Sequence, residues 1–404
     1  MIKIAVLGYG TVGSGVFEVI RTNRERIRKN AGEEIEIKYV LDLRDFPGDP
    51  VSDVLVHDFN VILQDPEIQI VAEVMGGTGA AYQFTKQALL AGKSVCTSNK
   101  ALVAEHGREL MEIAREKNIN YLFEASCGGG IPIIRALNAS LTGDVINEIT
   151  GILNGTTNYM MYKMDVEGSD FDEVLKEAQQ KGYAEADPTA DVEGHDACRK
   201  IAILSTLAYS KYIDYKSIYT EGITKITPAD MDYAKAINRK IKLLATSKQM
   251  EEGCYAMVAP FLVNDENPLY GVNDVFNAVF VNGNMLGDAM FYGSGAGKLP
   301  TASAVVGDIV DAARHLKTGT IRNGWSGEPA HMMSLDHVTG EFLVRIKAEA
   351  REQAEAVFET KTILQLPNHP EEMALLTGEM SQGEYREKAS QLKDEILGMI
   401  RIKD

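Results

Sequence analysis

Residues 2–13 read IKIAVLGYGTVG, and this stretch decides the fold of the N-terminal part of the chain. The apolar run before the first glycine is typical of a buried parallel strand, and residues 12–28 follow with the pattern of a helix. Gly8, Gly10 and Gly13 fit the spacing G-x-G-x-x-G between that strand and that helix. We therefore predict a glycine-rich phosphate loop at the start of a parallel α/β sheet.

The three glycines of this loop have separate tasks. Gly8 allows a tight turn, Gly10 lets the backbone approach a pyrophosphate, and Gly13 lets the helix pack closely on the strand. The residues at the start of the helix, Thr11 and Val12, offer N–H groups and the positive end of the helix dipole to phosphates. The motif predicts a bound NAD or NADP, and an ordinary turn with three coincidental glycines is the alternative.

Strands and helices alternate after this loop. Apolar or β-branched runs predict further strands at 35–43, 68–77, 94–98 and 119–126. Helical periodicity predicts helices at 82–93 and 102–117. Such alternation is typical of a doubly wound parallel sheet, so we predict an N-terminal Rossmann domain in an α/β protein.

The pattern changes after Pro132. The remaining segments predict helices at 133–141, 171–181, 195–209 and 302–315, and strands at 149–155, 255–263 and 277–283. From about residue 340 the order is strand, helix, strand, strand, helix, strand. We expect three units: 1–133 with a returning helix at 297–320, an α+β catalytic and dimerisation domain with a mixed sheet at 134–296, and a small βαββαβ domain at 335–404.

Composition excludes several functional classes. The 404 residues carry a formal net charge of -17, which argues against nucleic-acid binding because that task needs a basic patch. No stretch approaches the roughly 18 consecutive apolar residues of a membrane span. The four cysteines form no CxxC pair, so neither a zinc site nor a disulfide framework is indicated. We expect a cytoplasmic protein that binds neither nucleic acid nor membrane.

Two residues after the second predicted strand bear on the choice of cofactor. Asp42 stands where an acid binds the ribose 2′-hydroxyl of NAD. Arg44 lies two residues further on and is suited to the 2′-phosphate of NADP. Both cofactors stay open, with Arg44 favouring NADP.

The segment 182–200, GYAEADPTADVEGHDACRK, concentrates acids ahead of a lysine. Asp196 and Lys200 are four residues apart and therefore share one face of the predicted helix. An acid beside a lysine in a cleft is suited to proton transfer to a substrate oxygen, whereas a solvated surface ion pair is the alternative. Asp191 is a candidate N-cap of that helix. Lys100 follows the strand 94–98, at the sheet edge where parallel sheets bind ligands, and a surface lysine that opens a helix is the alternative.

The run 123–132, FEASCGGGIP, joins the first two predicted domains. Its glycine-rich backbone and Glu124 are suited to a monovalent cation held by carbonyl and carboxylate oxygens. A flexible hinge is the alternative. Cys127 and Cys198 have no histidine placed by sequence to make a nucleophile, so we expect them to be packing residues, and we treat His195 as non-catalytic.

Taken together, these motifs resemble those of the homoserine dehydrogenase family. The segments that carry the resemblance run in family order between residues 8 and 308: GYGTVGSG, TSNKALVA, FEASCGGGIP, GILNGTTNYM, EAQQKGYAEADPTADVEGHDACRK and FYGSGAGKLPTASAVVGD. The resemblance implies NAD(P)-dependent interconversion of L-homoserine and L-aspartate 4-semialdehyde, in threonine and methionine biosynthesis. It also suggests a homodimer or a homotetramer.

The resemblance implies roles for single residues. Lys200 corresponds to the general acid/base at the substrate oxygen, and Lys100 to a second lysine near nicotinamide and substrate. The acids that hold the substrate or orient the lysines are Glu185, Asp191 and Asp196. Gly182 and Gly295 correspond to backbone positions that line the cofactor or substrate cleft.

The resemblance further implies a sodium ion in the 123–132 loop. Glu124 would bind it through its side chain, and Cys127, Gly129 and Ile131 through their carbonyls. The C-terminal βαββαβ unit resembles an ACT domain, although its KAEAREQ loop lacks the Asp-x-Pro-Gly type of turn common in ligand-binding members. The alternatives to the main reading are another Rossmann amino-acid oxidoreductase and a regulator that binds NAD(P) without catalysis.

Overall fold

The computed structural model describes residues 1–321 and 323–404. Its N-terminal part is a six-stranded sheet with the order β3-β2-β1-β4-β5-β6, in which every strand pair is parallel. The strands are β1 (Ile2–Leu7), β2 (Ile35–Leu41), β3 (Leu55–Val56), β4 (Ile68–Glu73), β5 (Ser94–Thr97) and β6 (Tyr121–Leu122). The predicted doubly wound sheet is confirmed, with β3 as a strand that the sequence pattern did not reveal.

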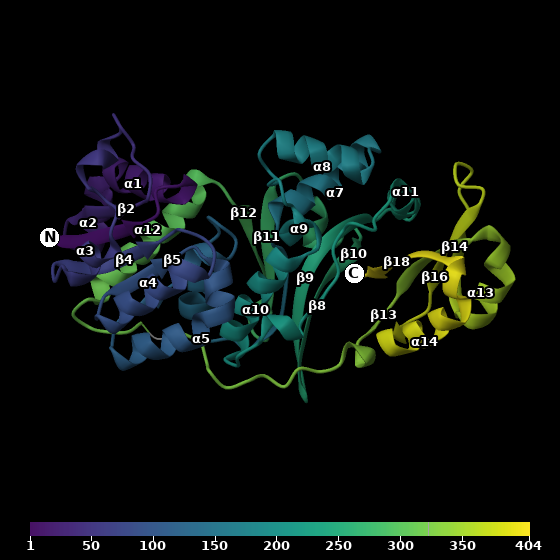
Figure 1. Cartoon of the computed structure of the whole chain (residues 1–404). Coiled ribbons are helices and arrows are strands. Elements are labelled where there is room, and N and C mark those ends of the chain that lie inside the picture. Colours follow the sequence, from purple (N-terminus) through teal and green to yellow (C-terminus); the bar gives the residue numbers. More distant parts are fainter. Residues whose placement is uncertain (322) are drawn as a thin grey trace.

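Helices flank this sheet on the N-terminal side of the molecule (Figure 1). They are α1 (Thr11–Thr22), α2 (Arg24–Ala31), α3 (Phe59–Gln64), α4 (Gly79–Leu90) and α5 (Lys100–Glu116). The single helix predicted at 12–28 is wrong, because the chain leaves helical geometry at Asn23, with φ -102° and ψ 21°, and starts a second helix.

The strand predicted at 119–126 is also too long. β6 ends at Leu122, and residues Glu124–Ser126 form a 3-10 turn. The backbone N–H of Glu124 donates to Asp308 Oδ2 at 2.8 Å, so the chain is turned out of the sheet at this point. This turn begins the loop that leads to the second sheet.

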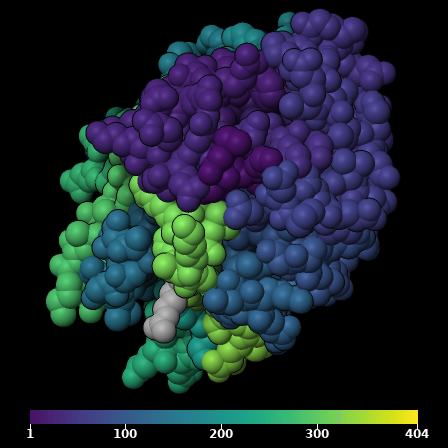
Figure 2. Space-filling view, turned by 90° about the vertical axis from the view of Figure 1, so that its left-hand side faces the viewer, coloured from purple at the N-terminus to yellow at the C-terminus, as the bar shows by residue number. Residues whose placement is uncertain are grey.

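A late helix returns to the first sheet, as expected. α12 (Lys298–His315) packs against α1 so closely that a Cβ added at Gly15 would lie 2.9 Å from the Ala302 Cβ. Lys298 Nζ forms an ion pair with Glu18 at 2.7 Å. Figure 2 shows a light-green surface band, which the colour bar places beyond residue 300, between the purple N-terminal surface and blue surface.

The second sheet has ten strands and mixed directions, ordered β12-β11-β7-β9-β10-β18-β14-β16-β15, with β8 beside β10. Its first part contains β7 (Ile146–Ile152), β8 (Tyr219–Thr220), β9 (Lys240–Met250), β10 (Gly253–Val263), β11 (Phe276–Gly283) and β12 (Gly287–Ser294). The helical segments between residues 133 and 236 are α6 (Ile133–Arg135), a π-helical turn Ala136–Ser140, α7 (Gly155–Glu167), α8 (Phe171–Gln180), α9 (Thr189–Val192), α10 (His195–Tyr209) and α11 (Pro228–Ala236). The sequence pattern did not reveal α7, α11, β9 or β12.

The C-terminal unit has the predicted order of elements, with the addition of two-residue strands β13 (Thr339–Gly340) and β17 (Met380–Ser381). Its main elements are β14 (Phe342–Lys347), α13 (Arg351–Val357), β15 (Thr360–Leu364), β16 (Glu372–Thr377), α14 (Gln382–Leu392) and β18 (Ile396–Ile402). β18 pairs in parallel with β10, Phe261 opposite Arg401, so this unit extends the second sheet. It lies at the end of the molecule opposite the first sheet (Figure 1).

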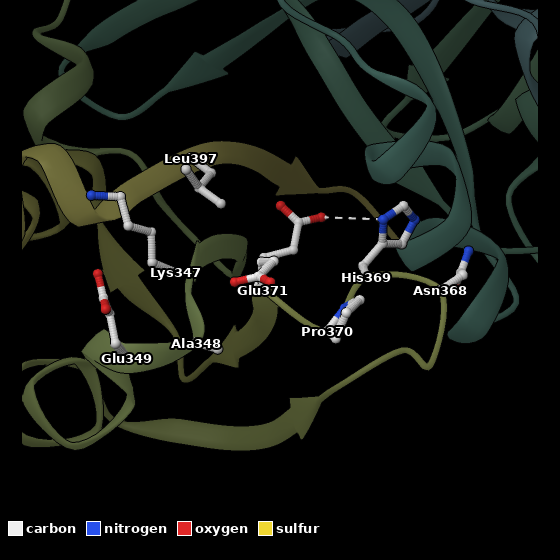
Figure 3. A pocket seen from close by; sticks show the side chains of 9 residues that line it. Lys347, Ala348, Glu349, Asn368, His369, Pro370, Glu371 and Leu397 are labelled. Carbon is white, nitrogen blue, oxygen red and sulfur yellow. Dashed lines mark ion pairs between the residues drawn. The ribbon is translucent and has the colours of Figure 1, made fainter.

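A cavity of about 680 Å³ opens on the C-terminal unit. Figure 3 shows Lys347, Glu349, Glu371 and Leu397 around it, with an ion pair drawn to His369 on one side. Neither Lys100 nor Lys200 lines this cavity. Among the described residues, no helix has the length and apolar character needed to cross a membrane.

Candidate active site

The glycine-rich loop has the geometry that the motif predicts. Gly8 follows β1 with φ +98°, and Gly10 is the N-cap of α1. A Cβ added at Gly13 would lie 1.9 Å from the Gly8 carbonyl oxygen, so strand and helix meet without room for a side chain. A Cβ added at Gly10 would meet nothing within 4 Å, and in the described part of the chain no side chain caps the helix there. The amides of Thr11 and its neighbours are therefore available to a phosphate.

The two residues that bear on cofactor choice bind each other. Arg44 donates from Nε to Asp42 Oδ1 and from Nη2 to Asp42 Oδ2, each at 3.0 Å. Tyr9 N–H, within the phosphate loop, also donates to Asp42 at 2.8 Å. Hydrogen bonds from Arg44 hold the pKa of Asp42 well below its usual range. Arg44 itself reaches solvent at the edge of the loop, next to β2.

Asp196 joins the two candidate lysines. Its Oδ2 lies 2.7 Å from Lys200 Nζ, one turn along α10, and its Oδ1 forms an ion pair of 2.5 Å with Lys100 Nζ. Lys200 also donates to the Leu153 carbonyl at 2.7 Å. Lys100 is the first residue of α5, at the carboxyl end of β5. The alternative of a solvated surface pair is wrong, because Asp196 is 2% and Lys200 7% exposed.

Burial and charge act in opposite directions in this cluster. Burial raises the pKa of Asp196, but the Lys200 and Lys100 ammonium groups outweigh it and hold that pKa well below its usual value. Burial lowers the pKa of Lys100, but the Asp196 carboxylate outweighs burial and leaves that pKa raised. Burial, together with the charge of Asp196, raises the pKa of Asp191. The bridging carboxylate is therefore ionised between two cations.

Asn154 belongs to the same hydrogen-bonded cluster, and the sequence analysis missed it. Its Nδ2 donates to Asp191 at 2.7 Å and to Asp196 at 2.9 Å, while its Oδ1 accepts from the N–H of Thr157 and caps α7. Its position in the segment GILNGTT, directly after a strand and before a helix, could have identified Asn154 from the sequence. The predicted N-cap role of Asp191 is wrong: it lies in α9, and Gly194 is the N-cap of α10.

Two predicted residues lie in an exposed turn between α8 and α9. Gly182 has φ +73° and follows Lys181, the C-cap of α8, and Glu185 is exposed. Among the described residues, no hydrogen bond or ion pair of the Glu185 carboxylate connects it to the lysine cluster. The Thr156 hydroxyl donates to the Tyr183 carbonyl at 2.6 Å, so this turn is attached to the start of α7, next to Asn154.

The loop predicted to hold sodium packs beside Gly295. A Cβ added at Gly129 would lie 2.4 Å from the Gly295 carbonyl oxygen. Gly295 in turn lies against Asn277, whose buried amide nitrogen and oxygen have no hydrogen-bond partner among the described residues.

Glu124 does not point its carboxylate into open space. Oε1 accepts from the Ile134 N–H at 2.9 Å and Oε2 from the Arg135 N–H at 2.7 Å, so the side chain caps the short α6 helix. Burial raises the pKa of this carboxyl. No hydrogen bond of the described residues uses the carbonyls of Cys127 or Gly129. These two carbonyls are open to a ligand, whereas the Ile131 carbonyl accepts from the Ile133 N–H.

The cysteines near the site are packing residues. Cys127 Sγ lies 3.7 Å from the Lys200 carbonyl, and burial raises its pKa to about 12. Cys198 Sγ lies 3.3 Å from the Tyr215 carbonyl, and burial raises its pKa as well. Neither thiol is set up as a nucleophile, because a nucleophilic cysteine needs a lowered pKa.

Two family models match the chain in consecutive segments. Residues 8–124 match "Homoserine dehydrogenase, NAD binding domain", and residues 132–310 match "Homoserine dehydrogenase". The first match covers the phosphate loop and Lys100, and the second covers the acids and Lys200.

Known proteins agree with these models. The homoserine dehydrogenase of Neisseria gonorrhoeae is 40% identical over 86% of this chain and 82% of its own length. The crystal structure of a homoserine dehydrogenase from Thiobacillus denitrificans has a TM-score of 0.94 at 34% identity, covering 100% of this chain and 98% of that one. A hyperthermophilic archaeal homoserine dehydrogenase in complex with NADPH has a TM-score of 0.68 at 29% identity, covering 80% and 99%. The chain belongs to the homoserine dehydrogenase family, NAD(P)-dependent oxidoreductases that interconvert L-homoserine and L-aspartate 4-semialdehyde.

Proposed function

We propose that Lys200 is the general acid/base of this reaction and that Lys100 stabilises the developing negative charge on the substrate oxygen. The observation that carries the proposal is the single buried carboxylate of Asp196, which binds both ammonium groups at the carboxyl edge of the first sheet. Open parallel sheets bind their ligands at this edge. Neither alternative, a different amino-acid oxidoreductase or a non-catalytic regulator, has support among the matched families.

Lys200, Lys100 and Asp196 have different roles in the reduction of the aldehyde. When bound, the nicotinamide supplies the hydride that adds to the aldehyde carbon. Lys200 gives a proton to the alkoxide oxygen that forms, and takes one from the hydroxyl in the reverse direction. Lys100 places a fixed cation beside that oxygen, where it stabilises the transition state more than the ground state. Asp196 orients both lysines.

The substrate's amino group needs an acid that remains open to a ligand. We assign this role to Glu185 and Asp191, because Glu185 is exposed on a turn that is attached to the start of α7 and Asp191 binds Asn154 there. In this proposal the backbone of Gly182 and Gly295 also contributes to the binding of substrate or cofactor.

The cofactor is held by the loop Gly8–Gly13, with Arg44 at its adenosine end. Because Arg44 already neutralises Asp42, a 2′-phosphate at this position would meet a guanidinium rather than a bare carboxylate. We therefore propose NADP as the preferred cofactor, with NAD accepted.

We propose a sodium ion in the 123–132 loop, bound mainly by the carbonyls of Cys127 and Gly129 with that of Ile131. The donor set fits a hard monovalent cation, since it consists of oxygens. Glu124 caps α6 with one bond to each carboxylate oxygen, and the remaining lone pairs are suited to the side-chain ligation that the resemblance implies.

We also propose that the chain forms a dimer through the open side of the second sheet. On β12, Met290 and Tyr292 are 43% and 53% exposed, and Met285 and Leu286 extend the apolar surface at the preceding turn. An exposed apolar patch on an edge strand is typical of a protein interface. The ACT-like character of residues 335–404, the three functional units and the cytoplasmic location stay predictions.

The decisive test replaces Lys200 with alanine. We expect kcat to fall by about 10²- to 10⁴-fold, the range for loss of a general acid/base, while the affinity for the reduced cofactor changes little. Lys211→Ala, on the surface just after α10, is the matched control and should keep normal turnover. Near-normal turnover of Lys200→Ala with homoserine, followed by nicotinamide absorbance, would refute the assignment.

A further inference from the structure

We propose that the buried carboxylate of Glu73 is a positioning residue, which holds Lys100 and the loop 75–77 against the nicotinamide end of the cofactor. This inference rests on the function proposed above. Glu73 lies in none of the motifs that identified the site, and it is the last residue of β4.

Glu73 is a buried acid whose hydrogen bonds go to two loops. It is 0% exposed, and no ion pair of the described residues includes it. One carboxylate oxygen accepts from the Met75 N–H at 2.8 Å, and the other accepts from the Thr97 hydroxyl at 2.6 Å. Burying an acid without a cation is unfavourable, so stability alone gives no reason for a carboxylate here.

The contact with Thr97 continues to Lys100. The Thr97 hydroxyl oxygen accepts from the Asn99 N–H at 2.9 Å. The Asn99 side chain accepts from the Leu102 N–H at 3.1 Å, which caps α5, and donates to the Gly77 carbonyl at 2.6 Å. The side chains of Glu73, Thr97 and Asn99 thereby connect the loop after β4 with the loop after β5. Lys100 directly follows Asn99 in the chain.

The order of strands in the first sheet indicates which part of the cofactor lies near the loops after β4 and β5. β1 carries the phosphate loop and β2 carries Asp42 and Arg44, so the adenosine lies on the β2 side. The nicotinamide then extends over the other neighbour of β1, which is β4, and toward β5. The loop after β4 touches the phosphate loop, since a Cβ added at Gly8 would lie 3.2 Å from Met75 Cα.

The arrangement needs two acceptors at residue 73. The Met75 amide donates to one oxygen and the Thr97 hydroxyl donates to the other, while the Thr97 oxygen accepts from the Asn99 N–H. A carboxylate accepts both bonds, whereas the amide of a glutamine presents one acceptor and one donor. Glu73→Gln therefore keeps the shape but cannot accept both bonds, so one of them must break or reverse its direction.

The test compares matched variants in the full chain. Glu73→Gln and Thr97→Val should lower kcat by about 10- to 100-fold, the scale of a small misplacement of reacting groups. Homoserine deuterated at C4 should show a larger isotope effect on kcat in these variants than in the parent, because hydride transfer becomes rate-limiting. Thr97→Ser restores the hydroxyl and should restore most of the turnover. Glu112→Gln, exposed on α5, is the control for the charge change.

The outcomes separate this inference from the function it rests on. Normal kcat and an unchanged isotope effect in both Glu73→Gln and Thr97→Val would overturn it, even if Lys200→Ala is inactive. If Glu73→Gln fails to fold, the contrast between Thr97→Val and Thr97→Ser decides: equal turnover in these two variants would overturn it. If Lys200→Ala keeps its activity, the proposed function fails instead.

Discussion

The carboxylate of Asp196 lies 2.7 Å from the ammonium of Lys200, on one face of α10. The second oxygen of this carboxylate binds the ammonium of Lys100, the first residue of α5, which follows β5 of the first sheet. One side chain thus connects the nucleotide sheet to the helix that carries the proposed acid/base. The pair is buried, so its charges act in a medium that screens them less than water does.

Asp196→Asn keeps the size of this side chain and removes its charge. We expect kcat to fall by about 10²- to 10³-fold, comparable to losing one preorganised electrostatic group. Because Asp196 raises the pKa of Lys100, its removal should lower that pKa. The alkaline limb of the pH–rate profile should therefore move to lower pH where Lys100 controls it. Asp187→Asn, at an exposed position in the same segment, is the control, and an equal effect of both variants would contradict the assignment.

Asn154 has two roles that substitution can separate. Serine at this position still caps α7, because its hydroxyl reaches the same amides, but it is too short to bind Asp191 and Asp196. We expect Asn154→Ser to keep the thermal stability and to lose turnover, whereas Asn154→Ala should lose both, with about 1 kcal/mol of stability lost through the cap. Melting temperatures and kcat of the two variants check this. Full turnover in Asn154→Ser would show that the carboxylates need no amide donor.

Arg44→Ala tests the choice of cofactor. Without the guanidinium, Asp42 would face a 2′-phosphate as an unpaired anion, so KM for NADP should rise by about tenfold, or roughly 1.4 kcal/mol. KM for NAD should change little, because Asp42 can then bind a ribose hydroxyl. Arg28→Ala, on the surface of α2, is the control. A parallel change in KM for both cofactors would argue against a contact with the 2′-phosphate.

We expect the stability of the second sheet to depend on pH through Lys242. It is 2% exposed on β9, and burial lowers its pKa to about 7. The unfolded chain keeps this proton to a pH near 10. Between these values the unfolded state binds more protons, so the free energy of unfolding rises with pH, by at most about 1.4 kcal/mol per pH unit from this group.

Lys242→Met should remove that part of the pH dependence. We would compare urea unfolding at about pH 7 and about pH 9.5, values that lie within the window in which the linkage acts. Lys248→Met, exposed on the same strand, should keep the slope of the parent protein. A Lys242→Met slope identical to that of the parent would mean that Lys242 keeps its proton in the fold, held by the carbonyl of Val272 and its neighbours.

Local sequence determined the first sheet and the helix that carries Lys200. The loop Gly8–Gly13 needs only three glycines at set spacings between an apolar run and a helix, and the run and the glycines lie within residues 2–13. Likewise, Asp196 and Lys200 face each other because α-helical geometry places residues four apart on one side. The helical periodicity of the surrounding residues made that prediction possible.

Tertiary structure alone decided what these local pieces meet. Lys100 and Asp196 are 96 residues apart, and only the packing of α5 against α10 brings them into contact. Packing also decided three other contacts: the bond of Asn154 to Asp196, the pairing of β18 with β10, and the capping of α6 by the Glu124 carboxylate. Helical periodicity is a property of neighbouring residues, whereas these contacts depend on how distant elements bury their apolar faces together.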